Sequence, residues 1–233
     1  MKSFSLGFIL LTGSFVFAAT EENIVVMPKT NEQVYQGSSA FHRIDKKFQV
    51  TYQPLGATSN NAGETGLSFG YFIDRDSMIL VNATSGQNKI SSRTESSDGA
   101  RSSSEERFSS QSLGVSYKRF FANSFYARSG LDQRRTNADY SYSGFLFLPA
   151  ESASFTVNTT SLSLAIGNQW QWENFTLGCD WFGLSQPLMH SFSNESVSDQ
   201  PQSIYADQVK RDKKQYGEQL AGMFLQVYLG ATF

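Results

Sequence analysis

The stretch FLQVYLGATF, from Phe224 to Phe233, ends the chain on an aromatic residue. Its odd-numbered positions from 225 onward are apolar, whereas its even-numbered positions include Gln226, Gly230 and Thr232. A period of two is typical of a β-strand whose two faces meet different surroundings. Soluble chains usually end in polar residues that fray. We therefore interpret residues 221–233 as a strand with one face against lipid and one face toward a narrow lumen.

The same alternation recurs along the chain and predicts seven further strands. They cover residues 48–52, 67–73, 78–85, 113–117, 125–131, 162–167 and 175–181. Very short connections at 74–77, 120–124 and 172–174 alternate with long Ser-rich and charged ones at 86–110, 133–156 and 185–216, and the connection at 57–64 is of modest length. This alternation is typical of a transmembrane barrel with tight periplasmic turns and long outer loops. Strands in lipid must also close on themselves, because every backbone polar group needs a partner there.

Length, composition and charge limit the other classes of protein that the chain could form. Residues 1–19 carry Lys2, an apolar stretch and small residues at Ala18–Ala19, which predicts a cleaved signal peptide. Residues 20–47 are expected to form a flexible periplasmic leader, and residues 48–233 the barrel. After the first twenty residues, no apolar run is long enough for a spanning helix. A formal net charge of −2 gives no case for nucleic-acid binding, and the single cysteine, Cys179, forms no intramolecular disulfide.

The last strand also carries a family resemblance. With Leu225, Val227, Leu229 and Phe233 on one face, it resembles the C-terminal assembly signal of bacterial outer-membrane barrels. Residues 48–233 as a whole resemble the small eight-stranded barrels of the OmpA, OmpX and OmpW type. The resemblance implies an all-β, eight-stranded antiparallel transmembrane barrel in the outer membrane of a Gram-negative bacterium. It also implies insertion by the barrel-assembly machinery, and an even number of strands places both termini in the periplasm.

Charged residues on the second strand face are the candidate lumen residues. By strand phase these are Lys118, Arg128, Asp180 and Glu218. A barrel of this size is filled by its own side chains, and buried charges pair with one another. The main interpretation is therefore a closed interior and a structural or surface-interaction role. Two alternatives are a narrow pore for small solutes and a soluble periplasmic barrel of the lipocalin type that binds a ligand inside.

A lipid A modifying enzyme is a further alternative. The stretch HSFSNES holds His190, Ser193 and Glu195 and resembles the pattern of outer-membrane deacylases. The Ser-Asn pair falls one residue later here, so a strand would place His190 and Ser193 on opposite faces. Metal clusters, phosphate-binding glycine loops and nucleotide motifs are absent from the sequence. We expect neither an enzyme nor a cofactor.

Several segments suggest partners at the two membrane surfaces. Residues 86–111 form either a solvated loop or a hairpin above the membrane, and their basic side chains could contact lipopolysaccharide phosphates. These side chains are Lys89, Arg93, Arg101 and Arg107. The apolar patch Phe145–Leu148 could contact a surface ligand. In the leader, Ile24, Val25 and Val26 follow two acidic residues and resemble the segment by which outer-membrane receptors engage the energy transducer TonB.

Overall fold

The computed structural model describes residues 38–58, 61–95, 101–121, 123–143, 151–197 and 206–233. Two helices and nine strands lie in this part of the chain: α2 (Ser39–His42), β1 (Phe48–Thr58), β2 (Asn61–Ala62), β3 (Thr65–Asp74), β4 (Ser77–Glu95), β5 (Arg101–Phe121), β6 (Phe125–Ser143), β7 (Glu151–Trp172), β8 (Phe175–Val197), α3 (Ala206–Gly217) and β9 (Ala221–Thr232). The signal peptide and most of the leader lie outside the described residues.

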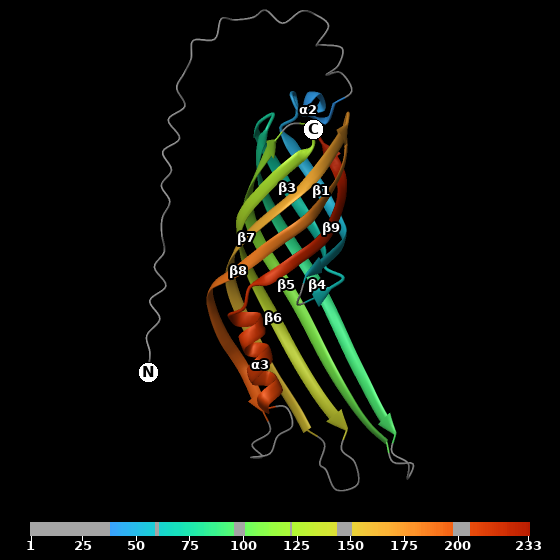
Figure 1. Cartoon of the computed structure of the whole chain (residues 1–233), viewed down its shortest axis with the longest axis vertical. Helices are drawn as coiled ribbons and strands as arrows, with labels where there is room; N and C mark the ends of the chain where they lie inside the picture. The colour runs from blue at the N-terminus through green and yellow to red at the C-terminus, as the bar shows by residue number, and fades with distance from the viewer. Residues whose placement is uncertain (1–37, 59–60, 96–100, 122, 144–150, 198–205) are drawn as a thin grey trace, which may run out of the picture.

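Eight of the described strands close into an antiparallel ring (Figure 1). Each long strand pairs with the next one along the chain, and β9 returns to pair with β1. Gln49 lies opposite Thr232 and Tyr52 opposite Leu229 across this closure. The two-residue strand β2 only folds back on the end of β1. The predicted eight-stranded antiparallel barrel is therefore confirmed, together with its three tight turns.

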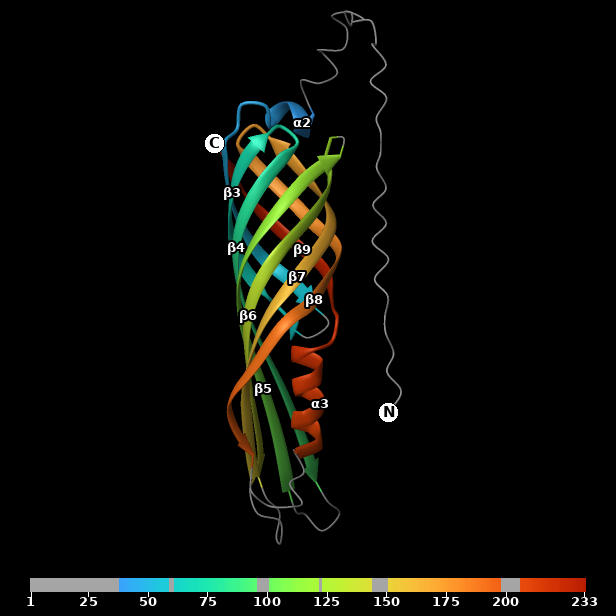
Figure 2. The ribbon, with the colours of Figure 1, turned by 90° about the vertical axis from the view of Figure 1, so that its left-hand side faces the viewer.

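The strands differ greatly in length. β1, β3 and β9 have 10 to 12 residues, which matches the 9–11 residues that a tilted strand needs to span a bilayer. β4 to β8 have 19 to 23 residues. Their extra length, roughly 30 Å at about 3.3 Å per residue, projects beyond the ring as a five-stranded sheet (Figures 1 and 2). We call this sheet the extension.

The extension corrects the three long loops expected at 86–110, 133–156 and 185–216. The ladder between β4 and β5 runs unbroken from Ser77–Arg119 to Glu95–Arg101, so most of residues 86–111 forms a hairpin and not a solvated loop. These strands lack a clear apolar alternation because their outer face is polar. The segment 145–148 lies outside the described residues.

Helix α3 packs on the inner face of the extension and gives it a core (Figure 2). Val209 of α3 is buried, and Tyr216 packs against the same cluster. The buried strand residues of this cluster are Phe108, Ala138, Tyr140, Ala153, Phe155 and Val157. The expected loop at 185–216 therefore contains the end of β8 and a helix. No helix in the described part of the chain is long and apolar enough to cross a membrane.

The final strand departs from strict alternation at one point. Leu225 has φ of +48°, a left-handed conformation that is uncommon for a branched side chain. The bulge shifts the phase of the strand, so Met223 is buried and Phe224 is exposed. This reverses the faces expected for the first part of the strand, residues 221–224. From Gln226 onward the expected alternation holds.

Candidate functional site: belt, lumen and extension

An apolar belt surrounds the ring between the tight turns and the extension. Large apolar side chains such as Leu67, Leu113 and Leu131 are 54–60 % exposed on the outer face. An exposed apolar surface that encircles a barrel is the surface that a bilayer requires. Exposed aromatic side chains border the belt beside the tight turns and the C-terminus: Phe48, Tyr71, Phe121, Phe125, Trp172, Phe175 and Phe233. Phe120, which also lies beside a tight turn, instead points inward and is buried.

A charged cluster fills the middle of the lumen. Arg128 and Asp180 form an ion pair with 2.5 Å between Nη2 and Oδ2, and Tyr126 donates a hydrogen bond to the other oxygen of Asp180. The Asp180 side chain is 6 % exposed and the Arg128 side chain 19 %. The carboxylate therefore has two donors in a site from which water is largely excluded. This arrangement offsets the cost of burying the charge.

Lys118 extends this cluster toward the end of the barrel that carries α2. Its ammonium donates to Oε1 of Gln169 and to the hydroxyl of Tyr228, each at 3.0 Å. It also lies 4.1 Å from the centre of the Tyr126 ring, a cation–π contact. The side chain of Lys118 is 3 % exposed. These buried side chains fill the middle of the described barrel, as the closed-lumen interpretation predicts.

A small polar cavity lies between this cluster and the extension. Its volume is about 50 Å³, which holds roughly three water molecules. Arg134 pairs with Glu64 at 3.5 Å on its wall, and Asn82 donates to Asp132 at 3.4 Å. The cavity is thus a small polar chamber whose lining carries two acidic and two basic side chains.

Helix α2 and the residue after it close the other end of the barrel. Arg43 is fully buried, and its guanidinium donates to the carbonyl of Arg75 at 3.0 Å and to that of Asn123 at 2.9 Å. The same group lies 3.9 Å from the centre of the Phe120 ring. Ser39 accepts a hydrogen bond from the backbone N–H of Gln171. Residues 38–47, which we expected within a flexible leader, therefore bind two tight turns and strand β7.

Several charges on the extension are paired. Glu105 contacts Lys89 at 2.9 Å and also contacts Arg107, and the hydrogen bond from Lys89 lowers the pKa of the Glu105 carboxyl. Lys213 of α3 binds Glu195 of β8 at 2.7 Å. Two of the four basic residues expected to contact lipopolysaccharide, Lys89 and Arg107, therefore share one carboxylate, which offsets one of their two positive charges.

Helix α3 is held to the extension by polar as well as apolar contacts. Tyr140 donates a 2.5 Å hydrogen bond to Asp212, and Gln208 donates to Glu106 at 2.7 Å. Burial raises the pKa of the Asp212 carboxyl, and the nearby Glu106 carboxylate raises it further. Burial also raises the pKa of Tyr216 to about 12. The helix is thus a docked element with a titratable carboxyl at its interface.

The structure brings together three of the four predicted lumen charges. Lys118, Arg128 and Asp180 meet in the cluster above, whereas Glu218 lies outside the lumen and is exposed beyond the end of α3. The prediction for Glu218 is wrong because it assumed that the last strand begins earlier. Of the expected assembly residues, Leu225, Leu229 and Phe233 are exposed on the outer face and Val227 is half-buried. Ile24, Val25 and Val26 lie outside the described residues.

The deacylase-like residues do not form a catalytic arrangement in the described structure. His190 packs against the ring of Phe192, with 5.1 Å between the ring centroids. Glu195 forms an ion pair with Lys213. Ser193 is exposed, three residues further along β8 than His190. Among the described residues, no cluster of His, Cys, Asp and Glu is arranged to hold a metal ion.

Several lumen residues were not identified from the sequence. Asp132 and Arg134 have the same phase as Arg128 in β6, so extending that predicted strand would have found them. Arg43 and Glu64 lie outside the predicted strands, and no sequence pattern marks them. Their roles depend on contacts with residues distant in the sequence.

The closed ring, its apolar belt and its filled lumen define a small transmembrane β-barrel. No protein-family model matches the chain, and no curated protein matches it. Among solved structures, the chain is similar to Ail, the attachment invasion locus protein of Yersinia pestis, at 13 % identity and a TM-score of 0.44, with 82 % of this chain and 100 % of that chain covered. A second Ail structure, in complex with the heparin analogue sucrose octasulfate, has 12 % identity, a TM-score of 0.42 and the same coverage. CarO2 of Acinetobacter baumannii has 11 % identity and a TM-score of 0.43, covering 82 % and 99 %.

Proposed function

We propose that this protein is an integral outer-membrane β-barrel with a closed lumen that acts through its extension at the cell surface. The observation that carries the proposal is the apolar belt around a ring filled by paired side chains. An exposed apolar surface of this extent marks a site of contact with a membrane or a partner. A lumen closed at two levels, by Arg43 and by the Lys118–Asp180 cluster, does not support transport.

The orientation follows from the lengths of the connections. The three tight turns and both ends of the barrel wall lie at the end that carries α2 (Figure 1), which we assign to the periplasm. The extension then lies outside the cell, where its sheet and the packed helix α3 offer a rigid surface. Its partners are outer-leaflet lipopolysaccharide and an external ligand. The barrel has no enzymatic activity in this proposal.

Labelling of introduced cysteines tests the location and orientation. In a Cys179→Ala background, Ser91→Cys places a thiol on the exposed face of the extension, and Glu173→Cys places one at a tight turn. A membrane-impermeant maleimide should label the first variant in intact cells and the second only after lysis. Labelling of the Glu173→Cys thiol in intact cells would contradict the proposal. Failure to label the Ser91→Cys thiol in intact cells would contradict it as well.

The surface role is tested by comparing cells that carry the wild-type barrel with cells that carry a barrel with a shortened extension. Replacing residues 88–108 by a tight turn removes the β4–β5 part of the extension and leaves the belt intact. Cells that carry this shortened barrel should show wild-type amounts of heat-modifiable protein and lose adhesion to a panel of immobilised polysaccharides and extracellular proteins. Unchanged adhesion across the panel would remove the support for a surface role.

A further inference from the structure

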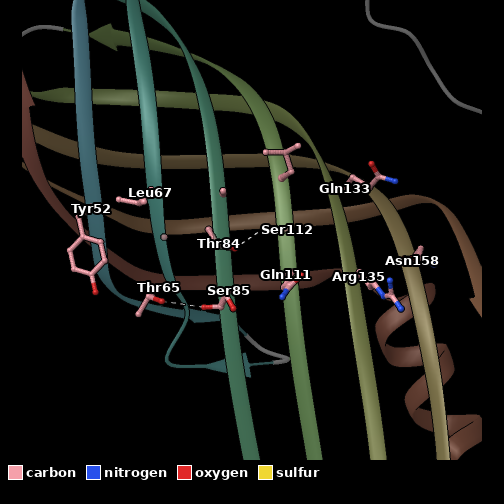
Figure 3. Close-up of a pocket in the computed structure, with 13 residues that line it drawn as sticks. Tyr52, Thr65, Leu67, Thr84, Ser85, Gln111, Ser112, Gln133, Arg135 and Asn158 are labelled. Atoms are coloured by element: carbon pink, nitrogen blue, oxygen red, sulfur yellow. Dashed lines mark hydrogen bonds between the residues drawn. The ribbon is translucent and has the colours of Figure 1, made fainter.

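An open groove of about 640 Å³ lies on the outer wall where the belt meets the extension (Figure 3). Its walls come from strands β1 and β3 to β7. We call it the boundary groove and define it by Tyr52, Thr65, Gly66, Leu67, Ala83, Thr84, Ser85, Gln111, Ser112, Leu113, Gln133, Arg135 and Asn158. The register places the small residue Ala83 between Leu67 and Leu113 on the neighbouring strands. The feature is separate from the lumen because its lining side chains are mostly those of the outward-facing strand positions.

The two sides of the boundary groove differ in polarity. The strand register places Ser85, Gln111, Arg135 and Asn158 opposite one another in one row across four strands. Two residues nearer the belt, the next row begins with Ala83 and Leu113. Leu113 is 59 % exposed, and Leu67 on the neighbouring strand is 60 % exposed. The lining of the groove therefore changes from exposed leucines to amides and a guanidinium over two residues along each strand.

Arg135 is the cation of this groove. The side chain is exposed, and within the described residues no ion pair engages it, whereas Lys89, Arg107 and Lys213 each bind a glutamate. Figure 3 shows Arg135 beside Asn158 and level with Gln111 and Ser85. A guanidinium binds phosphate through two parallel hydrogen bonds. The neighbouring amides supply donors and acceptors of the kind that bind sugar hydroxyls.

We propose that the boundary groove binds one lipid with a phosphorylated saccharide headgroup from the outer leaflet. Arg135 binds a headgroup phosphate, Gln111 and Asn158 bind the saccharide, and acyl chains lie along Leu67 and Leu113. The site rests on the proposed outer-membrane location, since the groove opens at the belt edge on the outer side. It is distinct from the Lys89–Arg107 cluster, where both cations are already engaged by the Glu105 carboxylate.

Native mass spectrometry of the full barrel, extracted in mild detergent and mixed with lipid A, tests this site. The probes are bisphosphorylated lipid A and the same lipid without phosphates. Arg135→Gln removes the proposed phosphate contact from an exposed side chain, so the fold is expected to be unaffected. Arg119→Gln is the matched control, because it removes an exposed arginine near the opposite edge of the belt.

The wild type should retain one bisphosphorylated lipid A and much less of the dephosphorylated lipid. Arg135→Gln should lower retention about fivefold, the loss expected for one cation near a lipid surface, and Arg119→Gln should match the wild type. Equal retention by Arg135→Gln and wild type, or equal retention of the two lipids, would overturn the site. A failure of the outer-membrane location itself would instead show in the cysteine-labelling experiment, which does not depend on Arg135.

Discussion

Replacing Asp180 by alanine should strongly destabilise the folded barrel. Asp180 is the carboxylate of the buried cluster and accepts hydrogen bonds from Arg128 and Tyr126. Its loss leaves the Arg128 guanidinium uncompensated, close to the buried ammonium of Lys118. Removing one member of a buried charge pair costs about 3–5 kcal/mol. We expect the free energy of unfolding of Asp180→Ala to fall by that amount.

Two further variants separate the effect of unpaired charge from the effect of lost side-chain volume. Arg128→Ala should cost less, about 1.5–3 kcal/mol, because Asp180 keeps the hydrogen bond from Tyr126. The triple variant Asp180→Leu, Arg128→Met, Lys118→Met should lie near the wild type, since apolar side chains of similar volume replace a buried ionic cluster at little cost. Such a recovery would show that the alanine variant is destabilised by unpaired charge and not by lost volume.

Urea unfolding of the lipid-inserted barrel, followed by the fluorescence of its three tryptophans, measures these differences. Glu105→Ala is the matched control, because Glu105 also contacts two cations but lies on the surface of the extension. This control should be indistinguishable from the wild type. An Asp180→Ala variant within about 1 kcal/mol of the wild type would refute the account of the cluster.

Three further predictions concern the ends of the barrel and α3. Phe233→Asp should reduce the amount of inserted barrel severalfold, whereas Ser91→Asp in the extension should not; equal heat-modifiable amounts in a gel would contradict the role of the last strand. Arg43→Ala should lower the free energy of unfolding by about 2–4 kcal/mol through two lost hydrogen bonds and a cation–π contact, and a variant as stable as wild type would disprove the closure by α2. The raised pKa of Asp212 means that α3 docking weakens as pH rises through the titration of that carboxyl. Asp212→Asn should remove this part of the pH dependence of α3 amide exchange, corrected for intrinsic rates, and an unchanged dependence would contradict it.

The ring could be predicted from the sequence because its signal is local. Alternation marks the outward faces of strands such as 67–73, and the tight turns fix which strands are neighbours. The same phase placed Lys118, Arg128 and Asp180 in the lumen, where the structure pairs Arg128 with Asp180.

The extension could not be predicted because its strands carry a weak apolar pattern. Their outer face is polar, and their inner core depends on α3, a helix that contributes only Val209 as a fully buried apolar side chain. The bulge at Leu225 reversed the phase of the strand without any sign in the residues. Arg43 lies in a polar segment, and only its contacts with two turns distant in sequence give it a role.

Planar bilayer recording with the purified, heat-modifiable barrel tests the closed lumen most directly. The Arg43 closure and the Lys118–Asp180 cluster both block the path through the ring. The account predicts that the folded protein inserts without discrete channel events. Discrete openings whose conductance changes in Arg128→Ala would contradict it and would show that the lumen conducts.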